Sequence, residues 1–114
     1  MEYKVYQIHL TDAEYDMVNA NGHYSVEKQV LKLDLGLSGD DMASLANTGF
    51  EKNYYTHVSN ITANDLDDVF RIGNNGDETK IERLADMFSI SVGDVIEDSN
   101  GVRNIVARFG FETI

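Results

Sequence analysis

The sequence predicts a small single α+β domain over residues 1–114, with a mostly antiparallel sheet of about four strands and helices packed on one face. Three observations predict this class. A chain of 114 residues that is 42% hydrophobic can bury one modest core. Strand-like segments alternate with segments whose apolar residues have helical spacing. The dipeptide Asn100-Gly101 is a strong hairpin signal, which favours antiparallel pairing.

The first strand is predicted over residues 3–10, because apolar residues at 6, 8 and 10 alternate with polar residues at 7 and 9. A helix should follow it. Thr11 and Glu14 have the spacing of a capping box, in which each side chain accepts a hydrogen bond from the other residue's amide. We expect this helix to end at Asn21-Gly22, since glycine readily adopts the backbone conformation that ends a helix.

Two more helices are expected before the next strand. The first begins after Ser25 and ends at Gly36 and Gly39. The second begins near Asp40-Asp41, whose carboxylates suit a helix N-terminus, and ends at Gly49. The apolar residues expected to face the core are Val26, Val30, Leu33, Leu37, Met42, Leu45 and Ala46.

Residues 53–61 predict a second strand, because they are rich in aromatic and β-branched side chains. Thr62 should cap the helix that follows, with Asp65 at the capping-box position. The Gly-Asn-Asn-Gly sequence at 73–76 is typical of a loop, and residues 78–87 predict a further helix.

The last segment, residues 89–114, predicts a closing hairpin that turns at Asn100-Gly101. Gly93 and Gly110 indicate a bulge or a close approach of backbone. We expect one core to contain Val30, Leu33, Leu45, Val69, Phe70, Leu84, Phe109 and Phe111. Replacing Phe109 by Ala would then cost a few kcal/mol of stability.

Composition excludes several kinds of chemistry. The chain has no cysteine, so it has neither a disulfide nor a thiol nucleophile. No apolar run is long enough for a membrane span, and no secretory signal is seen at the start, so a cytoplasmic protein is expected. The net charge of −11 is spread over both halves of the chain. Such a charge disfavours direct binding to nucleic acid or to a membrane and favours a basic surface on a protein partner.

No convincing active site or cofactor motif is present. His9, His23 and His57 lack the spacing of a zinc site. The aspartates at 65, 67 and 68 suit a helix N-terminus better than a divalent cation, although a cation there stays open. The loop at 94–101 matches a calcium loop only in part. The sequence therefore predicts a protein that is not an enzyme and that needs neither a cofactor nor a metal.

The second half carries a distinctive series of short segments. They are Tyr-Tyr-Thr-His-Val at 54–58, Leu-Asp-Asp-Val-Phe at 66–70, Ser-Ile-Ser-Val-Gly-Asp-Val-Ile-Glu at 89–97 and Phe-Gly-Phe at 109–111. This series resembles the YodL-like domain over residues 52–114. The first half, from Val5-Tyr6-Gln7 onward, is similar to short phage proteins with this ending. The resemblance implies a phage or another mobile element in a bacterial cytosol, and it implies no catalytic residue.

Two hypotheses for the function follow. In the first, the protein is an acidic accessory protein that binds a bacterial or phage protein, with mimicry of DNA against a nucleic-acid-binding or defence protein as one form. In the second, exposed tyrosines bind the partner and the charge serves only solubility, with Tyr3, Tyr6, Tyr54 and Tyr55 as candidates. Self-association stays open in both. The residues predicted to contact a partner are Asp65, Asp67, Asp68, Glu78, Glu82, Tyr54 and Tyr55.

Overall fold

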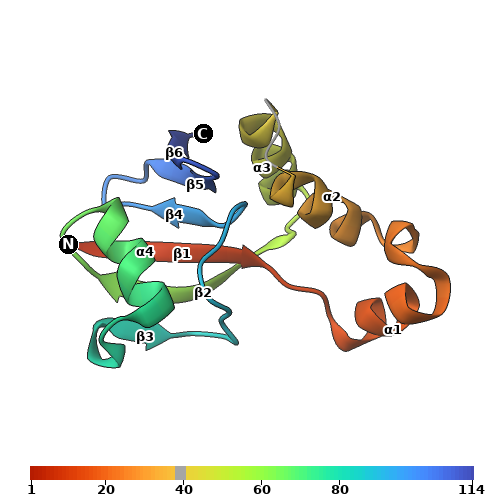
Figure 1. Ribbon diagram of the computed structural model, residues 1–114, viewed down its shortest axis with the longest axis horizontal. Helices are drawn as coiled ribbons and strands as arrows, with labels where there is room; N and C mark the ends of the chain where they lie inside the picture. Colours follow the sequence, from red (N-terminus) through yellow and green to blue (C-terminus); the bar gives the residue numbers. More distant parts are fainter. Residues whose placement is uncertain (38–40) are drawn as a thin grey trace.

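A computed structural model describes residues 1–37 and 41–114 and has one six-stranded antiparallel sheet (Figure 1). The strand order is β3-β2-β1-β4-β5-β6. The strands are β1 Glu2–Ile8, β2 Tyr55–Thr62, β3 Ile81–Arg83, β4 Val95–Glu97, β5 Arg103–Ala107 and β6 Gly110–Thr113. The α+β class is confirmed, with two more strands than expected.

Four α-helices accompany the sheet. They are α1 Asp12–Asn21, α2 Glu27–Gly36, α3 Met42–Glu51 and α4 Leu66–Asn75, and short 3-10 turns cover His23–Ser25 and Glu78–Lys80. The capping box of α1 is confirmed: the Glu14 amide donates to the Thr11 hydroxyl at 3.2 Å, and the Thr11 amide donates to Glu14 Oε1 at 2.8 Å. The boundary expected at residues 39 and 40 lies outside the described residues.

Helices pack on both faces of the sheet, so the expectation of helices on one face is wrong. Neighbouring residues of a strand point to opposite faces, and Val95 and Ile96 belong to different hydrophobic clusters. The first cluster, on the α4 side, is Tyr3, Val5, Val58, Ile61, Ala63, Val69, Ile72, Ile90, Ile96 and Val106. The second, on the side of α2 and α3, is Ile8, Leu31, Leu35, Met42, Ala46, Tyr55, Val95 and Ile105.

A β-bulge in β2 brings two of its residues to the same face. Val5 pairs with Ser59 whereas Tyr6 pairs with His57, so Val58 is the extra residue. Val58 and Ile61 are three positions apart, yet both reach the first cluster because of this bulge. The Val58 carbonyl also accepts hydrogen bonds from the amides of residues 84 and 85, which fixes the chain as it leaves β3.

Three predicted boundaries around the helices are wrong. Thr62 ends β2, and Asp65 is the residue that caps α4, accepting from the Asp68 amide at 2.8 Å. Gly49 lies inside α3, where a Cβ atom would be 2.8 Å from the Tyr55 ring. The Gly-Asn-Asn sequence at 73–75 continues α4 instead of forming a loop.

The helix predicted over residues 78–87 is also absent. After the short turn at Glu78–Lys80 the chain forms β3, which pairs with β2 through Ile61 and Ile81. The open edge of β2 offers hydrogen-bond partners along a whole strand. This tertiary pairing overrides the helical pattern of the local sequence.

The closing hairpin is confirmed and is extended by one strand. Asp98 Oδ1 accepts hydrogen bonds from two amides of the turn, and Gly101 adopts a φ of +82° that favours glycine. The chain turns again after β5 at Arg108 and Phe109 to form β6. Gly93 confirms the expected close approach, because a Cβ atom there would lie 3.1 Å from Leu35.

Several residues expected in the core are exposed. Phe109 is 93% exposed at the β5–β6 turn, so the expected cost of its substitution is wrong. The buried face of α2 is formed by Leu31 and Leu35, and not by Leu33 and Leu37. Phe70 and Leu84 are exposed as well, while Val69 is buried and Val30, Leu45 and Phe111 are half-buried.

Helix α1 makes little use of its apolar residues. None of its residues is buried, and Tyr15 and Met17 are exposed. In Figure 1 the helix lies at the end of the molecule away from the sheet. Its attachment depends on a few polar contacts, such as the ion pair between Lys28 and Glu14 at 2.8 Å.

Candidate functional site

The segment 84–94 crosses the sheet between its two halves and organises the candidate site. It connects β3 to β4, which lie on opposite sides of the β2–β1 pair, and it contains no helix or strand. Gln7, a buried residue of β1, holds it in place. Gln7 Nε2 donates to the Phe88 carbonyl at 2.9 Å, and the Phe88 amide donates to Gln7 Oε1 at 3.0 Å. We call this segment the crossover.

The same glutamine reaches the end of the crossover through Asp94. Gln7 Nε2 donates to Asp94 Oδ2 at 3.0 Å, and the Ser91 amide donates to the same oxygen at 2.9 Å. Nearby, the Tyr55 hydroxyl donates to the Gly93 carbonyl at 2.7 Å. Burial raises the pKa of the Asp94 carboxyl to about 7, although hydrogen bonds from Ser91 and Gln7 oppose the shift.

His9 completes this network at the surface. Its Nε2 lies 3.0 Å from Gln7 Oε1, and its ring centroid lies 4.7 Å from that of Phe88. Because Gln7 Oε1 is an acceptor, the hydrogen-bond network assigns the proton to His9 Nε2. Burial, and then the positive charge of Lys32, lowers the pKa of His9, which favours the neutral form of its ring. The side-chain amide of Gln7 lies between His9 and Asp94. An amide does not relay protons as a carboxylate in that position would, so no proton relay connects the two groups.

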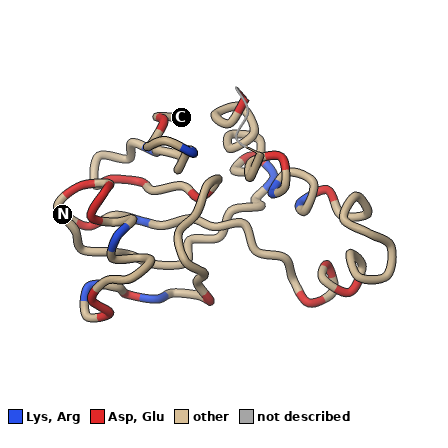
Figure 2. The backbone as a smooth tube through the Cα atoms, viewed as in Figure 1, with Lys and Arg blue, Asp and Glu red and all other residues tan. Residues whose placement is uncertain are grey.

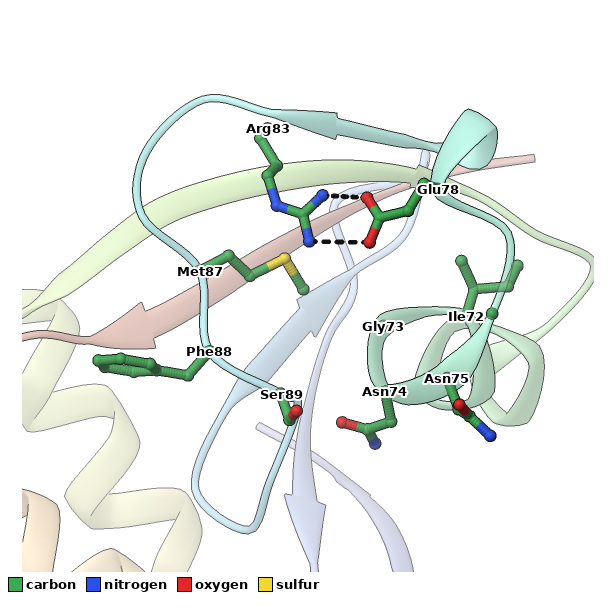
Figure 3. A pocket seen from close by; sticks show the side chains of 10 residues that line it. Ile72, Gly73, Asn74, Asn75, Glu78, Arg83, Met87, Phe88 and Ser89 are labelled. Carbon is green, nitrogen blue, oxygen red and sulfur yellow. Dashed lines mark hydrogen bonds and ion pairs between the residues drawn. The ribbon is translucent and has the colours of Figure 1, made fainter.

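A small pocket lies on one side of the crossover, against the C-terminal end of α4. Its volume is about 230 Å³, and Figure 3 shows the side chains that line it. Arg83 and Glu78, which both line it, form a two-point ion pair. On its α4 side lies Gly73, where a Cβ atom would come within 2.3 Å of Ile90. The one cation of this pocket is therefore already neutralised by a neighbouring carboxylate.

A larger cleft of about 480 Å³ lies on the other side of the crossover, toward α1. We call it the α1 cleft. Its lining is His9, Leu10, Asp12, Tyr15, Arg83, Ala85, Asp86, Met87 and Phe88. Tyr15 is 40% exposed and Phe88 is 55% exposed, so aromatic surface is open to solvent here. Within the described residues neither Asp12 nor Asp86 has an ion-pair partner.

The carboxylates predicted to bind a partner have local roles in the structure. Asp65 caps α4, and Asp68 accepts from the Asn64 amide and pairs with Arg71. The hydrogen bonds from Asn64 and Arg71 lower the pKa of Asp68. Glu78 pairs with Arg83, Glu82 accepts from Asn60 at 2.7 Å, and Asp67 borders a pocket beside β6. The structure does not gather these five side chains into one site.

The tyrosines predicted as partner contacts are largely covered. Tyr55 is buried and stacks on Phe50 with ring centroids 4.4 Å apart, so its expected role as a surface contact is wrong. Tyr3 is buried too, and Tyr6 and Tyr54 are half-buried. The exposed tyrosines are instead Tyr15 and Tyr24, at 40% and 85% exposure.

Sequence reasoning missed Gln7, Asp86, Phe88 and Asp94 as members of one site. Gln7 lies 81 residues from Phe88 and 87 residues from Asp94 along the chain. No spacing pattern connects positions so far apart. The one local signal is a polar residue between Tyr6 and Ile8 in a strand, and it cannot reveal that the amide is buried.

Within residues 1–37 and 41–114, no group of three or more His, Asp and Glu side chains is arranged to hold a metal ion. In that same part of the chain, no helix combines the length and the apolar character needed to cross a membrane.

The raised pKa of Asp94 leads to a test by pH. Its carboxyl binds protons in the folded protein up to about pH 7, but in an unfolded chain only up to about 3.8. Its contribution to stability is therefore complete below about pH 4 and is lost as the pH rises through 7. The variant Asp94→Asn keeps an acceptor for Ser91 and Gln7. Between pH 4 and 8 we expect its free energy of unfolding, measured in urea, to fall less than that of the original protein.

The expected difference is a few kcal/mol, at about 1.4 kcal/mol for each pKa unit. Asp67→Asn is the matched control, since its side chain is exposed. Parallel stability curves for the original protein and Asp94→Asn would show that Asp94 ionises normally.

Comparison with known proteins gives no relative: no family model, curated protein or solved structure matches this chain. The resemblance of residues 52–114 to the YodL-like domain therefore stays a prediction.

Proposed function

We propose that the protein is a non-enzymatic acidic module that binds a basic segment of a partner protein in the α1 cleft. One observation carries the proposal: exposed aromatic rings of Tyr15 and Phe88 lie in the same cleft as the unpaired carboxylates Asp12 and Asp86. A lysine or arginine side chain is attracted by both kinds of group, through charge and through the faces of aromatic rings.

The charged groups that line the cleft do not pair with these two carboxylates. Arg83 is the cation in its lining, and that guanidinium is paired with Glu78. The lowered pKa of His9 favours the neutral form of its ring. Lys32 lies nearby, with its ammonium 5.6 Å from the centroid of the Phe88 ring, but it forms no ion pair with Asp12 or Asp86. A partner cation would thus meet two carboxylates that no lysine or arginine side chain in the described part of the chain pairs with.

The whole molecule adds to this attraction. Six of the nine basic side chains form ion pairs, whereas most acidic side chains in the described part of the chain form none. The long-range field is therefore strongly negative. It repels nucleic acid and speeds the approach of a basic partner at low salt.

The arrangement of the acidic residues favours a partner that offers a basic segment over a partner that offers a DNA-binding groove. Mimicry of DNA needs carboxylates in a row like that of phosphates. Figure 2 shows acidic positions on several separate elements, including α1 and the region around β3. The mobile-element setting that the YodL-like resemblance implies would place the partner among bacterial or phage proteins of the host cytosol.

The test compares two variants of equal charge. In Asp12→Asn/Asp86→Asn both cleft carboxylates are neutralised, and in Asp34→Asn/Glu51→Gln two exposed acids outside the cleft are neutralised. We expect the tagged original protein and the Asp34/Glu51 variant to capture the same protein from a bacterial lysate at low salt. The cleft variant should bind it about tenfold more weakly, which corresponds to about 1.4 kcal/mol.

Elution at high salt is expected for the original protein, because the interaction depends on charge. Equal weakening in both variants would contradict the proposal, because it would show that the total charge matters and not the cleft. Unchanged capture by the cleft variant would contradict the proposal.

A further inference from the structure

The outermost strand β6 has one side without a partner. It pairs with β5 alone, and the Ile114 amide donates to the Arg103 carbonyl at 3.0 Å. Hydrogen-bonded pairs alternate along an antiparallel ladder, so residues 110 and 112 also face β5. Phe111 and Thr113 therefore direct their amide and carbonyl groups away from the sheet.

This edge lacks the proline and lysine that commonly protect an edge strand. Proteins guard edge strands with proline, lysine or a very short length. The four residues of β6 include neither proline nor lysine, and Glu112 is their one charged residue. The opposite edge, β3, is three residues long and carries Glu82 and Arg83. Of the two edges in the described sheet, β6 is thus the more receptive.

An apolar pocket of about 210 Å³ lies beside this edge, between α4 and the β5–β6 turn. Its apolar lining comes from Phe70, Val106, Ala107 and Phe111, and Asp67 and Arg108 contribute the charged groups. Phe109, 93% exposed at the turn, adds apolar surface next to it. An open edge beside an apolar pocket has the two parts used in strand addition: main-chain hydrogen bonds and a side-chain site.

We propose that β6 accepts an extended, basic segment of another protein as a seventh strand, with an apolar side chain of that segment in the pocket at Phe70 and Phe111. The charge of the chain selects this occupant. A second copy would bring two bodies of net charge −11 together. A basic segment would instead be attracted by the net charge of the chain and by Glu112 and Asp67, with Arg108 as the opposing charge in the pocket lining. This proposal is independent of the α1 cleft.

Thr113 offers a clean test, because its outward amide makes no bond to β5. Thr113→Pro removes that amide from the edge and keeps the ladder to β5, since proline is tolerated where the N–H faces solvent. Thr113→Ala is the matched control. Both variants lose the side-chain hydrogen bond from Thr113 Oγ1 to Asn104 Oδ1 at 3.0 Å, but the alanine variant keeps the amide.

The probe is a fluorescein-labelled peptide, Lys-Val-Lys-Phe-Lys-Val-Lys, followed by fluorescence anisotropy. We expect equal binding by the original protein and by Thr113→Ala, and at least tenfold weaker binding by Thr113→Pro. The variant Asp34→Asn/Glu51→Gln, whose exposed carboxylates lie outside both this pocket and the α1 cleft, should bind as the original does. A peptide with glutamate in place of lysine should not bind.

Amide hydrogen exchange of the original protein gives a second measure that needs no variant. Peptide binding should slow exchange at Phe111 and Thr113 and leave Ile81 in β3 unchanged. Equal binding by the proline and alanine variants, no binding by the original protein, or no protection at residues 111 and 113 would overturn the proposal. Concentration-dependent self-association that Thr113→Pro abolishes would also overturn it in favour of a second copy.

Discussion

Replacing Gln7 by Leu should destabilise the protein by about 3 kcal/mol or more. The leucine fills a similar volume but leaves the Phe88 amide and carbonyl without their partners and removes one donor from Asp94. Each buried polar group that loses its partner costs about 1–3 kcal/mol. Chemical denaturation followed by circular dichroism would measure the free energy of unfolding.

Gln29→Leu is the matched control for this change. Its side chain makes an exposed hydrogen bond to His23, so we expect a change within about 0.5 kcal/mol. A similarly small effect for Gln7→Leu would mean that the crossover is held by its apolar contacts alone. Release of the crossover in Gln7→Leu should also weaken binding in the α1 cleft, because Asp86 and Phe88 belong to that segment.

Replacing Ile96 by Ala should cost about 2–5 kcal/mol, in the range of large-to-small changes in a core. Ile96 is fully buried in β4, pairs with Val5 of the central strand and belongs to the cluster beneath α4. The cavity would lie where the two halves of the sheet meet. Thermal and urea denaturation would both show the loss.

Phe109→Ala is the informative comparison for Ile96→Ala. A larger side chain is removed, but Phe109 is 93% exposed, so we expect unchanged thermal stability. Equal losses in the two variants would show that the β5–β6 turn packs against the body of the protein. The pair thus separates burial from size as the cause of the effect.

Local signals predicted the elements whose boundaries depend on neighbouring residues. The capping box at Thr11 and Glu14, the exit of α1 at Gly22 and the turn at Gly101 all formed as expected. Each of these depends on hydrogen bonds or backbone angles within a few residues. Such contacts are encoded in adjacent sequence, which is why a single sequence is enough to find them.

The core was less predictable, because periodicity does not say which face of a helix is inward. Helix α2 carries apolar residues on two stripes, and the structure buries Leu31 and Leu35 while leaving Leu33 and Leu37 exposed. One contact that favours this face is with Gly93, where an added Cβ atom would lie 3.1 Å from Leu35. That contact joins residues 58 positions apart.

The candidate site was almost invisible in sequence for a related reason. Clustered carboxylates such as Asp67 and Asp68 attract attention, yet Asp68 is paired with its neighbour Arg71. The α1 cleft combines residues from α1, the end of β1, β3 and the crossover. None of them is unusual in its own segment, and only the fold brings them together.

The position of β1 in the middle of the sheet has a consequence for the order of folding. Both strands that flank β1 come later in the chain, beginning at residues 55 and 95. During synthesis, both edges of the central strand therefore stay unpaired while the helical segments emerge from the ribosome. Closure of such distant pairs is slow compared with helix formation. Early binding of β1 by a chaperone would protect the segment on which the rest of the sheet is assembled.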